Sequence, residues 1–239
     1  MPTEPYAELA ELAGGFIHEI KNHLSTLGLN LQLLAEDFQQ PQNQRERRAL
    51  ERISRLQGEC QSLVDVANDF LRFARVKDLE LNRGNLIAVV EELVDFFTPT
   101  ARQSSIDIKC YLPSDLPPVL LNKDLFRQAL LNLMLNAQQA MPEGGELTIQ
   151  AERSPDGVCL SLIDTGKGMT PESTAKAFEP FFSTKPGGTG LGLATTRKIV
   201  EAHGGSIAIQ SEVGRGTKIS IQLPVANPKP GGNRHELNS

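Results

Sequence analysis

The sequence predicts an α+β protein in which a long helical hairpin precedes a domain of helices packed on a β-sheet. Up to Ala74, apolar residues recur in steps of three and four, the period of amphipathic helices. Beyond residue 78, short alternating segments typical of strands are interleaved with shorter helical patterns. A stretch rich in glycine and proline, residues 165–188, has no sustained period and predicts a long functional loop.

The hairpin is expected to consist of two long helices. The first runs from about Pro5 to Phe38 and ends before Pro41, because proline cannot continue the hydrogen-bond ladder. The second carries an apolar stripe from Leu50 to Ala74. One hairpin cannot enclose two stripes of this length, so we expect two copies to form a dimeric four-helix bundle. The alternative, a hairpin packed on its own downstream domain, stays open.

The rest of the chain divides into shorter elements, and the predicted domains are residues 1–77 and 78–225, followed by a disordered tail at 226–239. The expected elements are an edge strand near 79–81, a helix from Asn85 to Phe97 closed by Pro99, a strand at 105–112, a loop at 113–120, a helix from Asn122 to Met141, a hairpin at 146–153 and 158–163, a helix at 191–203, and a last hairpin at 206–212 and 217–223.

Composition excludes several classes of protein. A net charge of −5, no Trp and only two Tyr argue against a nucleic-acid partner. No apolar run approaches the roughly 18 residues that a membrane span needs, and the N-terminus lacks the features of a signal peptide. Cys60, Cys110 and Cys159 are far apart and are expected to be small buried residues in a reducing compartment. A cytoplasmic protein with no membrane segment in this chain is expected.

His18 lies on the exposed side of the first predicted helix. It is two positions from both Phe16 and Ile20, which places it about 200° around the axis from the apolar stripe. Glu19 is adjacent, and Asn22 is one turn farther along. A histidine between a carboxylate and an amide is arranged for reaction, although a lone helical histidine is more often an ordinary surface residue.

Two later clusters suggest a nucleotide pocket. Asn132 and Asn136 share one face of a predicted helix, and amide groups suit Mg²⁺ and phosphate. Asp164 ends a predicted strand, where its carboxylate could accept a hydrogen bond from the amine of adenine. Gly166 and Gly168 would then let the backbone approach a planar ring closely.

Two further clusters lie at the edge of the predicted loop. The aromatic residues of FEPFFSTK, residues 178–185, would anchor the loop, and Lys185 could reach a phosphate. The run GGTGLGLA, residues 187–194, opens a helix whose first N–H groups would face phosphate. This run fits neither the P-loop pattern nor the dinucleotide-binding pattern.

Five segments in order carry a resemblance to a known family. FIHEIKNHL, NLMLNAQQAM, DTGKGM, FEPFFSTK and GGTGLGL resemble the H, N, G1, F and G2 boxes of bacterial two-component sensor histidine kinases. The match covers nearly all of residues 10–224, and HEIKN looks most like the nitrogen-regulator type. The resemblance implies a hairpin for dimerisation and histidine phosphotransfer, then an α/β sandwich of the Bergerat type that gyrase, Hsp90 and MutL share.

The resemblance implies roles for individual residues. It implies autophosphorylation by ATP with Mg²⁺, transfer to an Asp of a response-regulator receiver domain, and removal of phosphate from that regulator. His18 matches the phosphoacceptor, Glu19 the acid that orients it, and Asn22 the amide of the phosphatase motif. The implied nucleotide contacts are Asn132 near the phosphates, Asn136 as Mg²⁺ ligand, Asp164 with Gly166 and Gly168 at adenine, Lys185, Thr189, Gly190 and Gly192 in the lid, and Thr217 beside Asp164.

Two positions depart from the family pattern. His23 stands where relatives usually have proline, so we expect a straighter first helix without a kink at Leu24. Gln139 stands where many relatives have lysine, so one phosphate contact is expected to be missing and ATP affinity to be modest.

Two other functions use the same features. An ATPase clamp of the gyrase, Hsp90 and MutL kind would need a water-activating Glu on the helix at 122–141, and the matching region has none. A non-catalytic dimeric scaffold would have no use for intact nucleotide motifs. No sensor precedes His18, so the chain is expected to be either a fragment of a longer kinase or one driven by a partner.

Overall fold

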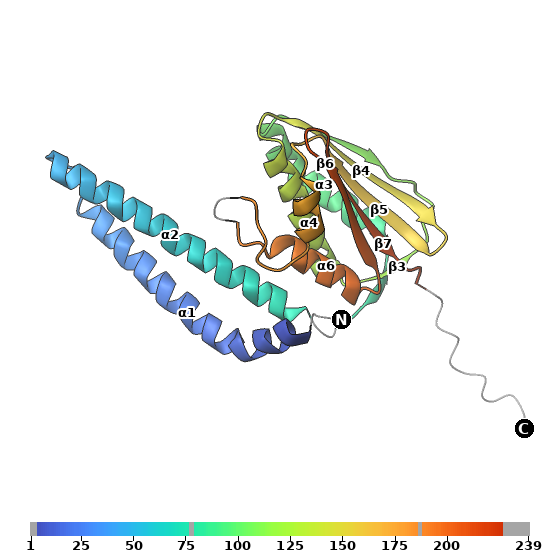
Figure 1. The fold of residues 1–239 in the computed structure, drawn as a ribbon, viewed down its shortest axis with the longest axis horizontal. Helices are drawn as coiled ribbons and strands as arrows, with labels where there is room; N and C mark the ends of the chain where they lie inside the picture. Colours follow the sequence, from blue (N-terminus) through green and yellow to red (C-terminus); the bar gives the residue numbers. More distant parts are fainter. Residues whose placement is uncertain (1–3, 77–78, 186–187, 227–239) are drawn as a thin grey trace, which may run out of the picture. The chain divides into compact units, whose positions relative to one another are not determined.

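The computed structural model describes residues 4–76, 79–185 and 188–226 (Figure 1). The chain divides into two compact units. The first contains the two long helices together with residues 176–198, and the second contains the rest of the described chain. The sequence assigns 176–198 to the downstream domain, whereas in the structure this segment groups with the hairpin.

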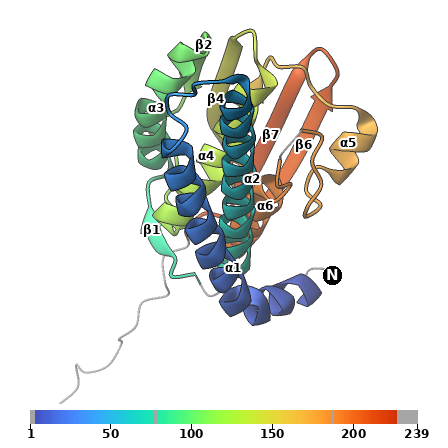
Figure 2. The same cartoon turned by 90° about the vertical axis from the view of Figure 1, so that its left-hand side faces the viewer.

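Two antiparallel helices form the hairpin, α1 (Glu4–Glu36) and α2 (Gln44–Arg75), and they pack side by side over most of their length, while the first turns of α1 bend away from α2 (Figures 1 and 2). Asn43 caps α2 by accepting from the N–H groups of Arg45 and Glu46 at 2.9 and 3.1 Å. Glu46 returns the contact by accepting from the Asn43 side-chain nitrogen at 2.7 Å, and it also accepts from the Gln42 N–H. This reciprocal cap fixes where the second helix begins. The helical assignment of α1 continues without a break through His23 and Leu24.

The seam between the helices buries only part of the apolar surface. Ile53, Cys60 and Ala67 of α2 are buried there, while several large apolar side chains remain exposed. The exposed ones on the hairpin are Phe16, Leu27, Leu29, Leu33, Leu34, Leu56, Leu63 and Val66. A single hairpin therefore leaves an apolar surface uncovered, as the sequence predicts; the homodimer stays a prediction.

A five-stranded sheet organises the second unit, in the order β2-β4-β5-β7-β6. The strands are β2 (Ile106–Tyr111), β4 (Gly145–Ser154), β5 (Gly157–Asp164), β6 (Ser206–Glu212) and β7 (Gly216–Leu223). Only the β2–β4 pair is parallel among the pairs of this sheet. A small separate sheet pairs β1 (Asn82–Gly84) with β3 (Val119–Leu121).

Helices cover one face of the five-stranded sheet (Figure 1). These are α3 (Leu86–Gln103), α4 (Lys123–Ala140) and the end of α6 (Gly192–Ala202). Phe97, Phe126, Leu133, Leu147 and Leu160 are almost completely buried in the core between the two layers. Alternate residues of the strands supply the sheet side of this core.

Several sequence-based boundaries prove wrong. α3 continues past Pro99 to Gln103, because Phe97 and Ala101 are buried on the same face and the exposed proline lies away from it. Residues 119–121 form a strand rather than loop, and the edge strand lies at 82–84 rather than 79–81. A short helix, α5 (Pro171–Lys176), interrupts the expected long loop.

The cysteines also differ from the expectation of three buried residues. Cys60 is buried, Cys159 is half-buried and Cys110 is exposed. Although Cys110 is exposed as a residue, partial burial of its thiol, with Glu91 and Asp95 nearby, raises the pKa of that thiol.

Order extends slightly into the expected tail. Val225 forms a β-bridge with Val119, and the Ala226 N–H donates to the Pro118 carbonyl at 2.9 Å. The rest of the expected tail, 227–239, lies outside the described residues. Among the described helices, none combines the length and the apolarity needed to cross a bilayer.

Candidate functional site

A row of three polar residues crosses adjacent strands at one end of the sheet. Asp164 is the last residue of β5 and lies opposite Thr217 of β7, which in turn lies opposite Ser211 of β6. The Ser211 hydroxyl lies 2.9 Å from the Thr217 hydroxyl and donates to the Gly216 carbonyl. It also accepts from the Met169 N–H at 2.9 Å. Strand register therefore places Thr217 beside Asp164, where the family resemblance expects it.

Asp164 is a buried carboxylate, with 8% of its surface exposed. Its Oδ1 accepts from the Gly166 N–H at 2.9 Å, which fixes the orientation of the carboxyl group. A buried carboxylate is costly unless polar groups surround it, so such a residue at a strand end is a functional candidate. Ser211 was missed from the sequence, although counting residues from the β6–β7 turn would have placed it opposite Thr217.

The glycines after Asp164 are needed for backbone packing. A Cβ at Gly166 would lie 2.7 Å from the Ala140 carbonyl oxygen. Gly168 has φ +64°, and a Cβ there would collide with the Glu212 carbonyl. These contacts place the loop between the end of α4 and the β6–β7 turn. The sequence attributed both glycines to the approach of a ring, and the structure supplies this second reason.

Asn132 and Asn136 lie in line with the contact at Ala140. The spacing of four brings all three to one side of α4, at the edge of its buried stripe, and both asparagines are half-buried. The Lys167 N–H, three residues after Asp164, donates to the Ala140 carbonyl at 3.0 Å. The two amides and the carboxylate thus belong to one region of the second unit. Gln139, one of the positions that depart from the family, is exposed on α4.

The glycine-rich segment belongs to the first unit. We call its described residues, 178–185 and 188–191, the lid. The Lys185 N–H donates to the Ser183 hydroxyl at 3.1 Å. Gly190 has φ +67°, and the Phe181 N–H donates to its carbonyl at 3.1 Å. Gly192 begins α6, and Thr189 contacts α2.

His18 is exposed on α1, as predicted, with Glu19 and Asn22 exposed beside it. The Asn22 side-chain nitrogen lies 3.3 Å from Nδ1 of His18. An amide nitrogen can only donate, so in this arrangement Nδ1 accepts and the ring proton is on Nε2. The contact that the structure describes for the imidazole is with Asn22; the role expected for Glu19 stays a prediction.

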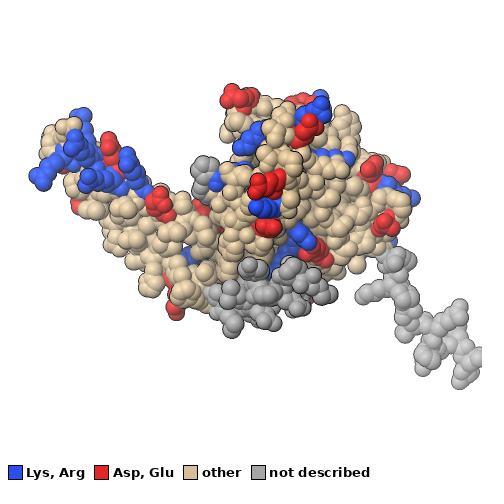
Figure 3. All heavy atoms as spheres, viewed as in Figure 1, with Lys and Arg blue, Asp and Glu red and all other residues tan. Residues whose placement is uncertain are grey.

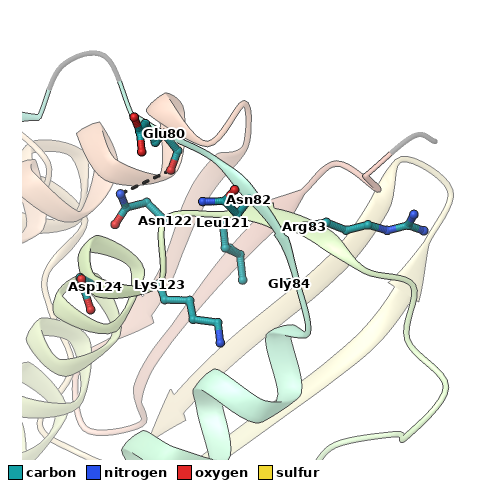
Figure 4. A pocket seen from close by; sticks show the side chains of 8 residues that line it. All are labelled: Glu80, Asn82, Arg83, Gly84, Leu121, Asn122, Lys123 and Asp124. Atoms are coloured by element: carbon teal, nitrogen blue, oxygen red, sulfur yellow. Dashed lines mark hydrogen bonds between the residues drawn. The ribbon is translucent and has the colours of Figure 1, made fainter. Parts of the chain in front are cut away.

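A shallow cavity of about 300 Å³ lies elsewhere, between the β1–β3 sheet and the start of α4 (Figure 4). The Asn122 side chain donates to the Glu80 carbonyl there. Arg83 extends away from Asn122 and Lys123, so the charged groups do not converge (Figure 4). This cavity is separate from the row at Asp164.

Comparison with known proteins identifies the family. The family described as histidine kinase-, DNA gyrase B-, and HSP90-like ATPase matches residues 121–227. The histidine-protein kinase AtoS of Escherichia coli K12 is 33% identical over 97% of this chain. The crystallised catalytic domain of histidine kinase ThkA is 31% identical, with a TM-score of 0.56, over 61% of this chain and 96% of that domain. The chain belongs to the sensor histidine kinase family.

The histidine kinase fold extends over both units. Full-length ShkA, crystallised with AMPPNP, matches 90% of this histidine kinase chain and 45% of its own length, with 29% identity and a TM-score of 0.70. ThkA in complex with the response regulator TrrA matches 92% of this chain and 63% of its own, with 25% identity and a TM-score of 0.66. These likenesses confirm the predicted fold class, a helical hairpin followed by a mixed α/β domain of the GHKL type.

The chain spans a minor part of its curated relatives. It covers 37% of AtoS and 29% of the sporulation kinase E of Bacillus subtilis 168. The activity and the partners of those whole proteins therefore enter only as proposals.

Proposed function

We propose that this chain is the catalytic core of a histidine kinase, which moves the γ-phosphoryl group of ATP to His18 and then to an Asp of a response regulator. One observation carries the proposal. An exposed imidazole, hydrogen-bonded to Asn22, occurs in a chain whose residues 121–227 match the histidine kinase-, DNA gyrase B-, and HSP90-like ATPase family.

The row at Asp164 suits adenine. The amine of adenine would donate to the buried carboxylate, while Thr217 and Ser211 supply hydroxyl groups next to it. Guanine presents a carbonyl at the corresponding position and would leave two acceptors facing each other. The row therefore supports selection of ATP over GTP.

Transfer to His18 forms a P–N bond as the bond from phosphorus to the ADP oxygen breaks. Attack through Nε2 requires a lone pair there, so the ring proton must be on Nδ1. Glu19, adjacent in sequence, would accept a hydrogen bond from Nδ1–H of His18 and stabilise the positive charge that develops on the imidazole ring. The Asn22 amide must then turn its oxygen toward Nδ1 or release it.

Charge on the transferring group is stabilised by other parts of the chain. The groups proposed to contact phosphate are Asn132, the side chain of Lys185, the hydroxyl of Thr189, and backbone N–H groups at Gly190 and Gly192. Asn136 would help to hold Mg²⁺, which neutralises charge on the phosphate oxygens when it is bound. In the described residues, no group of three or more His, Cys, Asp or Glu side chains could hold a metal. Asn136 would add one amide ligand to a Mg²⁺ ion that is already bound to ATP.

Hydrolytic removal of the phosphoryl group from the regulator is proposed to use the same helix. Asn22 is one turn from His18 and exposed, so its amide could position a water molecule against the phospho-Asp of a bound regulator. We propose this phosphatase activity as a second activity of the chain.

A homodimer is proposed from the exposed apolar side chains. On α1, Phe16, Leu27 and Leu34 lie on one side of the helix, at spacings of eleven and seven positions. On α2, Leu56, Leu63 and Val66 repeat in steps of seven and three. We call these six residues the dimer stripe, because a second copy would bury them in a four-helix bundle.

A different pair of exposed leucines is on the His18 side of α1. Leu29 and Leu33 are 58% and 53% exposed and lie about 100–160° around the helix from Leu27 and Leu34. They are about 16 and 22 Å along the axis from His18, within the roughly 30 Å that a small domain spans. We propose that the receiver domain covers these two leucines while it takes the phosphoryl group.

Positive charge at the nearby tip of the hairpin suits a receiver domain whose contacting surface is acidic. Figure 3 shows basic side chains gathered at the end of the hairpin where α1 and α2 are joined. The exposed arginines of this part of α2 are Arg45, Arg47, Arg48, Arg52 and Arg55. Such a cluster attracts acidic partners and raises association rates at low salt.

Incubation with γ-labelled ATP tests the proposal. Label should appear on the wild type, be acid-labile and base-stable, and disappear in His18→Gln. His23→Gln, on the same exposed helix, is the matched control and should label normally. ATP hydrolysis without labelling would favour an ATPase clamp, and an absence of nucleotide binding would favour a scaffold.

A further inference from the structure

The last turns of α2 hold the lid and the start of α6 through several contacts. The Thr189 hydroxyl donates to Oδ2 of Asp69 at 2.8 Å. The rings of Phe70 and Phe181 stack with their centroids 6.5 Å apart. Phe73 forms a buried cluster with the first turn of α6, and Lys198 Nζ donates to its carbonyl at 3.0 Å. Polar contacts at Asp69 and at the Phe73 carbonyl thus accompany apolar contacts of Phe70 and Phe73.

The bond to Asp69 occupies a group that nucleotide would need. A threonine hydroxyl has a single proton, so it can donate to the Asp69 carboxylate or to a phosphate oxygen, but not to both at once. The acceptor in the structure is an ionised side chain, and bonds to charged acceptors are stronger than bonds between neutral groups. The Thr189 oxygen itself also accepts from the Leu191 N–H at 3.4 Å.

Asp69 also places negative charge beside the lid. Its other oxygen is 3.7 Å from an exposed Arg72 nitrogen, which is a loose pair. A phosphate group near Thr189 would therefore meet a carboxylate that is only weakly compensated.

The backbone of the lid supports the same interpretation. Phe181 has φ +65°, a conformation that bulky residues rarely adopt without compensating contacts. Its N–H is bonded to the Gly190 carbonyl, and its ring is stacked on Phe70. The contact with α2 therefore accompanies an uncommon lid conformation, in which Phe181 is bonded to Gly190, the residue after Thr189.

We propose that Asp69 restrains the lid: its carboxylate and the phosphate groups of ATP compete for the Thr189 hydroxyl, so that the contact between α2 and the lid lowers the affinity for nucleotide. The inference rests on the proposed function, in which Thr189 contacts phosphate. It adds a regulatory role for a residue of the hairpin. Any signal that displaced the end of α2 would then raise nucleotide affinity.

Binding of AMPPNP with Mg²⁺ to the full chain, measured by calorimetry, tests this role. Asp69→Ala should bind at least about tenfold more tightly than the wild type, as expected for loss of one competing charged hydrogen bond. Asp65→Ala is the matched control, because Asp65 is one turn away on α2, exposed, and bonded to Gln61. It should leave the affinity unchanged.

A double-mutant cycle separates competition from a general effect on the fold. Thr189→Val should weaken binding, and Asp69→Ala should give no gain in the Thr189→Val background. Phe181→Ala removes the ring contact from an exposed side chain, leaves α2 intact, and should also tighten binding.

Each contrary result has a distinct meaning. Unchanged or weaker binding in both Asp69→Ala and Phe181→Ala, with unaltered thermal unfolding, would overturn the competition. An equal gain from Asp69→Ala with and without Thr189 would overturn it too. A wild type that bound no AMPPNP would instead remove the proposed function.

Discussion

We expect a single side chain, Asp164, to carry the recognition of the adenine base. It is buried, its Oδ1 is held by the Gly166 N–H, and it lies opposite Thr217. Exchange of the carboxylate for an amide keeps the shape but replaces an acceptor by a donor. The group at the second oxygen position, the one not bonded to Gly166, then decides whether an amine can bind.

Asp164→Asn should therefore lose ATP affinity by about ten- to a hundredfold, the usual effect of one unmatched buried hydrogen-bonding group. Calorimetric titration with ATP measures it, and thermal unfolding should change little because the volume is conserved. Glu152→Gln, on an exposed position of β4, is a control for the loss of one negative charge. Wild-type affinity in Asp164→Asn would contradict the assignment of the adenine site.

His203 is a second informative residue, and it acts on stability. It is 2% exposed, and Nε2 accepts from the Asn122 N–H at 3.0 Å, so the proton is on Nδ1, which donates to the Ile199 carbonyl at 2.7 Å. The ring thus links the end of α6 to the residue that caps α4.

Two amide substitutions distinguish the two bonds of His203. His203→Gln can still accept from Asn122, whereas His203→Asn is too short to do so and keeps only the contact near Ile199. We expect His203→Asn to lower the free energy of unfolding by about 1–3 kcal/mol more than His203→Gln, the cost of an unpaired buried N–H. Urea unfolding measures the difference, and equal losses would show that the link to Asn122 is unimportant.

At the scale of elements, α3 shows that tertiary packing can maintain a helix through a proline, a residue that usually ends a helix. Pro99 is inside α3, so one backbone hydrogen bond of the helix is missing, yet Phe97 and Ala101 are buried on either side of it in the sequence. Burial of two apolar side chains stabilises the last turns by more than the missing bond costs.

Pro99→Ala should accordingly stabilise the chain. The helix gains a hydrogen bond, and the greater freedom of the unfolded chain offsets only part of the gain, so we expect an increase of about 1–2 kcal/mol in the free energy of unfolding. Thr100→Ala, at the next exposed position, is a control that should have a small effect. A decrease for Pro99→Ala would mean that the proline fits α3 without cost.

At the scale of the molecule, the exposed leucines of α1 divide between two proposed interfaces. The dimer stripe and the pair Leu29 and Leu33 lie on different sides of the helix, so we assign each set to its own partner. The two interfaces can therefore be disrupted separately.

Leu27→Glu with Leu34→Glu should yield a monomer by light scattering, because each glutamate would be buried unpaired in the bundle. Leu29→Glu with Leu33→Glu should stay dimeric and label His18 normally. Phosphotransfer from this second variant to a panel of receiver domains from the same genome should slow at least about tenfold, as expected when two apolar contacts are lost. A monomeric second variant would mean that Leu29 and Leu33 also belong to the interface between copies.

The sequence by itself determined the hairpin, the order of most strands and helices, and the residues of the candidate site. Apolar periodicity specifies helices and strands locally, and His18, Asp164 and the glycine-rich segments are recognisable because their chemistry depends on residue type.

Tertiary structure alone decided which residues meet. Ser211 joins Asp164 through strand register, Pro99 is carried inside α3 by burial on both sides, and Thr189 is bonded to Asp69, 120 residues earlier in the chain. Such contacts depend on the packing of distant segments, for which a local pattern contains no signal.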